Sequence, residues 1–202
     1  SSMGQAITSG KPITYKKSPI HFEGIEAYRV SGTPADCVAL GIHLFEDIDL
    51  VLSGINIGAN LGNSAWHSGT LSAARQAVLF DVRGIALSVS VGDGEPDFES
   101  LKPFVQDALK EVINEKERKL LNINFPRNPE GEIIWTNQSI RHYDGKVIAN
   151  KDPMGRQHYW FTVTPIENVD EGSDRWAIRN GKTSITPMIL DLTDKEYLAQ
   201  RD

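Results

Sequence analysis

Apolar positions follow two different spacings in the first two thirds of the chain. Short apolar runs, typical of buried strands, occur at 26–30, 49–53, 84–91 and 119–125. Between these runs, apolar residues recur three and four positions apart, most clearly from Phe98 to Ile113, where we expect a helix that begins near Ser100. Strands that alternate with helices predict a three-layer α/β domain with a parallel sheet, which we assign to residues 1–126.

The helix that follows the first of these strands has a clear start. Thr33 is a favoured N-cap residue, and Pro34 is a favoured first helical residue. The apolar residues from Cys37 to Leu44 are dense enough to predict a mostly buried helix. We therefore expect Cys37 to be an inert core thiol, and Asp36 to interact with the helix N-terminus rather than act as an acid or base.

The pattern changes after about residue 126. Aromatic and β-branched residues, interrupted by proline and glycine, predict strands and hairpins, and another β stretch follows at 181–193. We expect an antiparallel, β-rich extension at 127–202 that reaches a partner subunit. We expect Tyr159, Trp160 and Phe161 to be β-core or interface residues rather than a base-stacking platform. The last residues, "DKEYLAQRD", predict a terminal helix or tail.

Composition narrows the choice of function. The chain has 202 residues, of which 40% are hydrophobic and 24% are charged, as in an ordinary globular protein. The formal net charge of −6 argues against binding of large nucleic acids, but not against a small phosphorylated ligand held by backbone N–H groups and a metal ion. Because there is a single cysteine and no apolar run of about 18 residues, we expect a cytoplasmic protein without a membrane span.

A glycine-rich stretch, "SGINIGANLGNSAWHSGT" at 53–70, separates a predicted strand from a predicted helix. Ligands of α/β proteins bind at this point, where a helix N-terminus offers free N–H groups to an anion. Ser68 or Thr70 can cap the helix, and Gly69 lets an anion approach the backbone. Asn56 and Asn60 offer amide oxygens to a cation or amide donors to a phosphate. The sequence therefore predicts an anion or metal site in this loop.

The loop has a purely structural alternative, and other candidate groups are weaker. The same residues would also suit a capped strand-to-helix turn that binds nothing. His67 lies beside "SGT", but a lone histidine is more often structural than catalytic. The remaining histidines show no metal-ligand spacing, and the acidic loop at 93–97 suits solvent better than a cation. Mg²⁺ sites draw on one or two carboxylates, so a metal in the loop needs acids from elsewhere in the chain.

Four stretches together resemble the SurE family of metal-dependent 5′- and 3′-nucleotidases. They are "SSMGQAIT" at 1–8, "SGTPADCV" at 31–38, the glycine-rich stretch with "HSGT", and "DPMGRQHYW" with "SITPMILDLT" near the end. The resemblance implies a Rossmann-like domain, a C-terminal extension that swaps between subunits of a homodimer or homotetramer, and a divalent ion, Mg²⁺ or Mn²⁺. It also implies Ser1 and Asn56 as metal ligands, Asn60 as a second loop asparagine, and a phosphate-binding triplet at Ser68, Gly69 and Thr70.

The chain also departs from the family pattern. The family's "NDDG" motif, whose two aspartates bind the metal, is absent, so we expect the first strand–helix unit to precede Ser1. His67 stands where the family often has tyrosine, and Gln76 stands where it often has glutamate. Without the two aspartates, we expect the chain alone to be nearly inactive.

The predicted function is hydrolysis of nucleoside 5′- and 3′-monophosphates. An intact site would use the ion to polarise the phosphoryl oxygens, while the N–H groups of the "SGT" triplet stabilise charge on them. Two alternatives are a non-catalytic oligomeric module that binds phosphate or nucleotide, and a purely structural protomer whose β arm makes the assembly.

Overall fold

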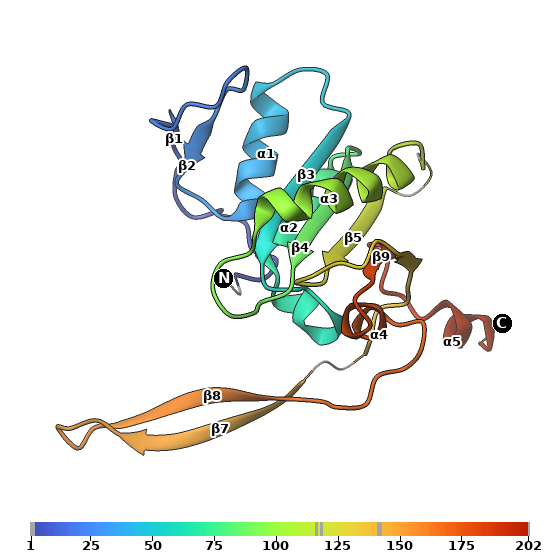
Figure 1. Ribbon diagram of the computed structural model, residues 1–202. Coiled ribbons are helices and arrows are strands. Elements are labelled where there is room, and N and C mark those ends of the chain that lie inside the picture. Colours follow the sequence, from blue (N-terminus) through green and yellow to red (C-terminus); the bar gives the residue numbers. More distant parts are fainter. Residues whose placement is uncertain (1–2, 116, 118, 141–142, 202) are drawn as a thin grey trace.

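The central sheet joins strands from both halves of the chain (Figure 1). The computed structural model describes residues 3–115, 117, 119–140 and 143–201. In pairing order, the sheet contains β3 (Leu50–Ile57), β4 (Arg83–Val89), β5 (Leu120–Phe125), β9 (Thr183–Met188) and β6 (Ile133–Trp135). Strands β3, β4 and β5 are parallel, whereas β9 runs antiparallel to β5 and parallel to β6. The α/β class and the parallel core that the sequence predicts are confirmed.

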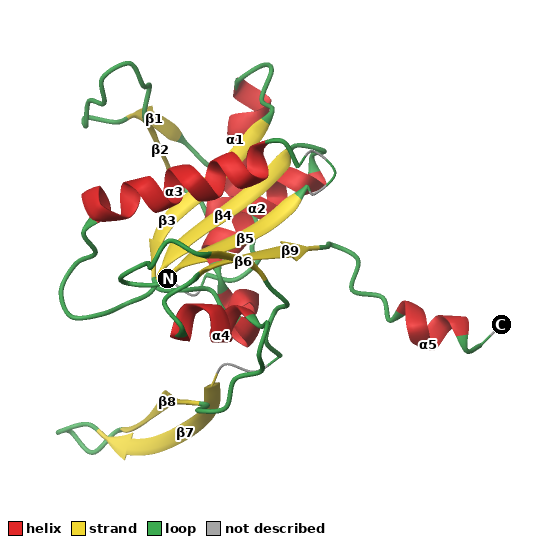
Figure 2. Ribbon diagram, turned by 45° about the vertical axis from the view of Figure 1, so that its right-hand side comes forward, coloured by secondary structure: helices red, strands yellow, loops and turns green. Residues whose placement is uncertain are grey.

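Helices cover both faces of this sheet, which gives three layers (Figure 2). The helices are α1 (Pro34–Leu44), α2 (Gly69–Leu79), α3 (Phe98–Ile113), α4 (Asp174–Arg179) and α5 (Lys195–Ala199), with a 3₁₀ helix η1 (Gly62–His67) before α2. Because successive side chains of a strand point to opposite faces, β4 contributes side chains to the apolar clusters on both faces of the sheet. Its Ile85, Leu87 and Val89 lie in the apolar cluster with α3, whereas Ala86 lies in a second cluster with α2. Helix α3 begins at Phe98 because Asp97 caps it, two residues before the expected start.

The predicted strand at 26–30 does not join the central sheet. Strand β2 (Tyr28–Val30) pairs antiparallel with β1 (Tyr15–Lys17) in a separate two-stranded ribbon. The expectation that it starts the parallel sheet is therefore wrong. The physical reason is that β2 is only three residues long and exposes Arg29, whereas a central parallel strand needs a continuous apolar run.

Helix α1 is less buried than its apolar residues suggest. It packs chiefly against α2, and only Ala35 and Asp36 among its residues are buried. Cys37 is exposed, so the expectation of an inert core thiol is wrong. The dense apolar run provides more apolar surface than the single helix contact covers.

The start of α1 fastens the N-terminal segment to the body. The Asp36 carboxylate accepts the main-chain N–H of Thr33 at 2.8 Å, while Thr33 Oγ1 accepts the N–H of Asp36, which completes a capping box. The same carboxylate accepts the Thr8 main-chain N–H at 2.8 Å and the Thr8 hydroxyl at 2.6 Å. Desolvation raises the pKa of Asp36, but the hydrogen bonds from Thr8 and Thr33 outweigh it and hold the pKa at about 2.

Replacing Asp36 with asparagine is expected to lower the free energy of unfolding at neutral pH by about 2 kcal/mol. A carboxylate with a depressed pKa stabilises the fold fully above its ordinary value of 3.8, and this contribution disappears as the pH falls toward 2. Urea unfolding of wild type and Asp36→Asn across this pH range measures the difference. The exposed Asp49→Asn variant is the control, and a loss that does not change with pH would contradict the prediction.

Strands β6 and β9 belong to the central sheet, although the sequence assigns this region to the extension. Residues Thr183 to Ile185 of β9 are buried. The hydroxyl of Thr136 lies 2.8 Å from both Ser184 Oγ and Thr186 Oγ1, so these polar side chains are satisfied inside the protein. Because the short polar side chains of β9 are hydrogen-bonded inside the protein, the sequence of this buried strand resembles that of an exposed one. Helix α4, which the sequence does not predict, packs against β9.

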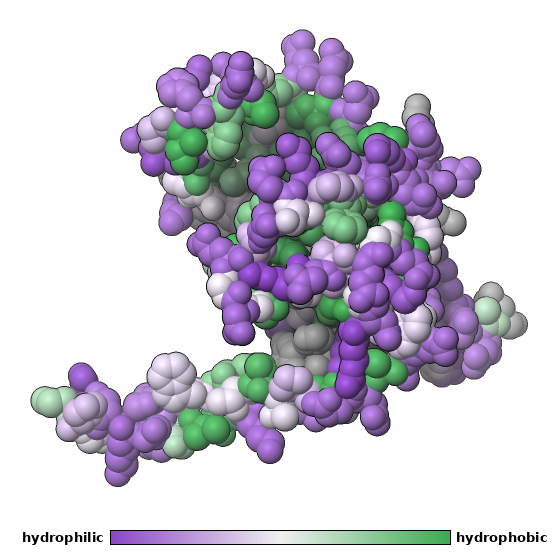
Figure 3. Space-filling model, in the orientation of Figure 1, coloured by the Kyte–Doolittle hydropathy of each residue, from purple (hydrophilic) through white to green (hydrophobic). Residues whose placement is uncertain are grey.

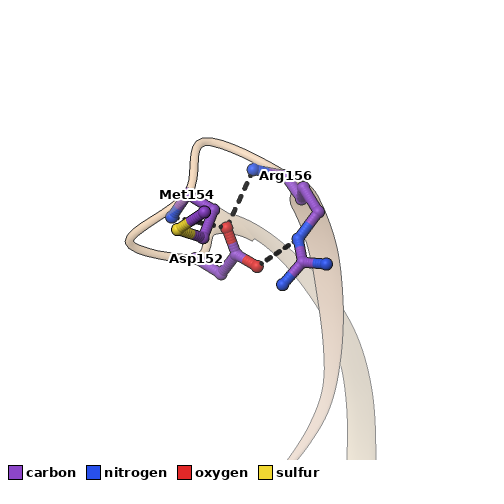
Figure 4. A network of polar contacts seen from close by, with 3 residues as sticks. All are labelled: Asp152, Met154 and Arg156. Carbon is purple, nitrogen blue, oxygen red and sulfur yellow. Dashed lines mark hydrogen bonds and ion pairs between the residues drawn. The ribbon is translucent and has the colours of Figure 1, made fainter.

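The hairpin of β7 (Tyr143–Lys151) and β8 (Gln157–Pro165) projects from the body as a sheet of its own. Apolar residues gather along it (Figure 3). Asp152 organises its turn: the carboxylate accepts the main-chain N–H groups of Met154 and Arg156, both at 2.9 Å, and Arg156 Nε at 2.8 Å (Figure 4). The hairpin and the terminal helix α5 are as predicted. Tyr159, Trp160 and Phe161 are exposed on the hairpin, so the expectation that they form a β core is wrong, because the hairpin is a two-stranded sheet of its own. No helix within the described ranges is both long and apolar enough to cross a membrane.

Candidate active site

A cavity of about 670 Å³ opens at the carboxyl end of β3, beside the N-terminus of α2. Five of the six predicted site residues line it: Asn56, Asn60, Ser68, Gly69 and Thr70. The sixth, Ser1, lies outside the described residues. Met3 lines the cavity, and its neighbour Gly4 donates its N–H to the main-chain oxygen of His67 at 3.0 Å. The volume is within the usual range for small-molecule sites.

Asn56 reaches the cavity because β3 is irregular at its carboxyl end. The register with β4 shifts between Ser53 and Asn56, and such bulges re-aim side chains near functional sites. Asn56 Nδ2 donates to the main-chain oxygen of Gly58 at 2.7 Å. Gly58 adopts a φ of 121°, a conformation that other residues rarely adopt. Because the donor end of the amide is engaged, Asn56 Oδ1 is left as a neutral oxygen ligand.

Asn60 is buried and is held at every polar position except one. Its main-chain N–H donates to Asn124 Oδ1 at 2.8 Å, and its main-chain oxygen accepts Asn122 Nδ2 at 2.9 Å. Its side-chain Nδ2 donates to Ser88 Oγ at 2.7 Å. This leaves Asn60 Oδ1 for the cavity that the residue lines.

The start of α2 presents two free N–H groups. Ser68 is the N-cap, and its Oγ accepts the N–H of Leu71 at 3.1 Å. The N–H groups of Gly69 and Thr70 precede the first intrahelical bond and have no partner in the described part of the chain. Free N–H groups and the helix dipole both favour an anion at this position.

Gly69 is also required by close packing. A Cβ at this position would lie 3.1 Å from Pro34 Cγ, at the start of α1. An added Cβ would therefore require Pro34 to move by a few tenths of an ångström.

The side chains that hold the glycine-rich loop in place are not predicted from the sequence. Asn122 and Asn124 are polar residues at alternate positions of the buried strand β5, and this spacing is the signal that could have identified them. Asp174 is buried on α4, and its carboxylate accepts the N–H of Gly62 at 2.9 Å, the N–H of Ser139 at 3.0 Å and the hydroxyl of Ser139. Asp174 thereby ties the loop after Asn60 to a segment 112 positions away in the chain.

The residues that line the cavity fit a divalent cation in part. Two neutral amide oxygens, on Asn56 and Asn60, are suitable ligands for a hard cation. Across the ranges that the structure describes, no group of three or more His, Cys, Asp or Glu side chains could hold a metal ion. The described residues thus provide the neutral donors of such a site but no acidic cluster.

Among the histidine and acidic candidates in the described part of the chain, His67 is the one that lines the cavity. It is exposed at the end of η1, and its main chain is used by Gly4. Asp36 lies at the cap of α1 and does not line the cavity, as expected of a residue that stabilises a helix N-terminus. Phe161 and Val163 of β8 line the cavity as well, which the sequence does not predict.

This arrangement defines a class of protein: an α/β protein with its ligand site at the carboxyl end of parallel strands, against a helix N-terminus. Residues 1–145 match the family model of survival protein SurE. The chain belongs to the SurE family.

Relatives match nearly all of the chain. It is 39% identical to 5′-nucleotidase SurE 1 of Thermus thermophilus over 202 residues, which cover 98% of this chain and 80% of that protein. It is 41% identical to 5′-nucleotidase SurE of Thermosipho melanesiensis over 206 positions, with 98% and 80% covered. The crystal structure of the SurE protein from Aquifex aeolicus superposes with a TM-score of 0.79 at 37% identity, over 98% of this chain and 81% of that one.

Proposed function

We propose that this protein is a metal-dependent phosphomonoester hydrolase that acts on nucleoside 5′- and 3′-monophosphates. One observation carries the proposal: two free N–H groups, on Gly69 and Thr70, share a cavity with the free amide oxygens of Asn56 and Asn60. The family relationship supports the reaction, since its relatives are named 5′-nucleotidases.

The residues of this chain would act mainly by positioning and by stabilising charge. The N–H groups of Gly69 and Thr70 donate to the phosphoryl oxygens, where negative charge is held in the transition state. The Ser68 hydroxyl can donate to the same group while its oxygen caps α2. Hydrogen bonds at its main-chain N–H, its main-chain oxygen and its Nδ2 hold Asn60 in a fixed orientation, so its Oδ1, an acceptor that suits a cation rather than a phosphoryl oxygen, needs no reorganisation during the reaction.

Asn56 and Ser1 are the proposed ligands of a divalent ion, Mg²⁺ or Mn²⁺. When bound, such an ion supplies Lewis-acid chemistry and lowers the pKa of a coordinated water. Asn56 is suited to this role because its Nδ2 is tied to Gly58 and its Oδ1 is not. The remaining proposals, which follow from the family, are a cytoplasmic location and a homodimer or homotetramer built with the extension at 127–202.

A non-catalytic nucleotide-binding module is the second candidate. The observation in its favour is that none of the described residues that line the cavity is acidic, so the described lining includes no carboxylate base. Such a module would bind nucleoside monophosphates without releasing phosphate.

Release of inorganic phosphate from nucleoside monophosphates by the full-length protein, with Mg²⁺ or Mn²⁺ present, tests the proposal. Thr70→Ala keeps the main-chain N–H but removes the Thr70 hydroxyl, which we propose as a further donor to the phosphoryl oxygens, so kcat/KM is expected to fall by about tenfold. Thr193→Ala, at an exposed position outside the cavity, is the matched control. Binding without phosphate release would support the non-catalytic module, and an unchanged Thr70→Ala would contradict the proposed phosphate position.

A further inference from the structure

The cavity has an apolar side that comes from the hairpin. Phe161 and Val163 of β8 line it together with the polar groups at the start of α2. The hairpin forms a sheet separate from the central one, so these two side chains reach the cavity from an element that takes no part in holding the proposed phosphate position. A ligand that fills the cavity would touch both kinds of surface.

The ring of Phe161 has a defined position on the hairpin, against Gly145. A Cβ at Gly145, on the facing strand β7, would lie 2.4 Å from Phe161 Cζ. The ring therefore lies across the bare backbone of Gly145, and no other residue at this position would leave room for it in this orientation. Phe161 and Val163 are on one face of β8, because side chains two positions apart point the same way.

The opposite face of β8 carries a matched aromatic residue. Trp160 is 63% exposed and Phe161 is 67% exposed, but Trp160 contacts the ring of His158 and does not line the cavity. The register that separates the two faces is set by pairing along the whole hairpin and by the Asp152 turn (Figure 4). The hairpin thus fixes which aromatic ring faces the cavity.

We propose that Phe161 is a specificity-determining residue that stacks on the base of a nucleoside monophosphate, with Val163 completing the apolar surface. This inference rests on the proposed function. A flat, largely exposed ring offers a stacking surface to any nucleobase, whereas it offers little to a sugar phosphate. The polar end of the same cavity would hold the phosphoryl group, so one ligand satisfies both ends.

A comparison of adenosine 5′-monophosphate with ribose 5-phosphate, which lacks the base, tests the inference. Phe161→Ala is expected to raise KM for the nucleotide by roughly tenfold and to leave KM for ribose 5-phosphate within about twofold. The value of kcat should stay unchanged for both, because stacking on the base is equal in the ground state and the transition state. Phe161→Tyr should restore the wild-type KM, and Trp160→Ala should behave as wild type.

Other outcomes would overturn the inference. Equal losses for both substrates, an unchanged KM for the nucleotide, or the same effect in Trp160→Ala would each do so. A change of molecular mass of Phe161→Ala in light scattering would show that the ring serves a subunit contact instead. If wild type releases phosphate from neither substrate, the proposed function fails, and calorimetric Kd values for the two compounds then test the stacking by the same ratio.

Discussion

Replacing Asn56 with alanine is expected to lower kcat/KM for a nucleoside monophosphate by about 100-fold while the fold stays intact. The side chain is half-buried and makes one hydrogen bond to the described residues, to the main-chain oxygen of Gly58, so we expect its loss to cost little stability. Its Oδ1 is the oxygen that we propose as a ligand of the cation. Steady-state kinetics at several Mn²⁺ concentrations measure the effect, and the ion concentration that gives half-maximal activity should rise.

Two further variants test whether the loss of activity is specific to the oxygen of Asn56. Asn150→Ala removes an exposed amide on the hairpin and should keep wild-type activity. Asn56→Asp keeps an oxygen ligand but loses the donor to Gly58, so it should fall between Asn56→Ala and wild type. Full activity in Asn56→Ala, or an unchanged dependence on Mn²⁺, would exclude Asn56 as a ligand.

Replacing Asp174 with alanine should lower the free energy of unfolding by about 3 kcal/mol. The carboxylate is buried and accepts four donors, two of them from Ser139 and one each from the main chains of Gly62 and Arg175. Removing it leaves these buried donors without their partner and releases the loop that follows Asn60. Chemical denaturation gives the stability, and the same preparations give the activity, which should fall because the loop carries the site.

The Asp174→Asn variant removes the negative charge but keeps the shape of the side chain. The amide keeps one oxygen for Ser139 but turns an N–H group toward a donor, so about half of the loss is expected. The exposed Asp191→Asn, on the chain after β9, is the control. A stable Asp174→Ala variant with normal activity would show that the loop is held by other contacts, such as the bond from Gln138 to the Gly62 oxygen.

Much of the core follows from the sequence because its signals are local. The strands β3, β4 and β5 and the helices α2 and α3 each carry an apolar period or a cap within their own residues. The same is true of the glycine-rich loop, since a helix N-terminus after a parallel strand is a local feature. Five of the six proposed site residues therefore line the cavity as the sequence and the family resemblance indicate.

The parts that the sequence does not predict depend on distant residues. Strand β9 is placed by its pairing with β5, and the hydroxyls of its Ser184 and Thr186 are satisfied in the core by the distant Thr136. Asp174 acts on a loop more than one hundred positions away. Phe161 reaches the cavity from β8, which belongs to a separate sheet. None of these contacts leaves a period or a motif in the chain.

The proposed phosphate position on α2 and the proposed base surface on the hairpin belong to different elements, so selection can change one without the other. Main-chain N–H groups at the start of α2 do not depend on side-chain identity, so they withstand mutation at most positions of the helix. The surface at Phe161 is a side chain on an independent sheet, and one substitution alters its shape. Related chains could therefore accept different substrates while they keep the same reaction. We expect such differences at position 161 and at its neighbour across the hairpin, Gly145.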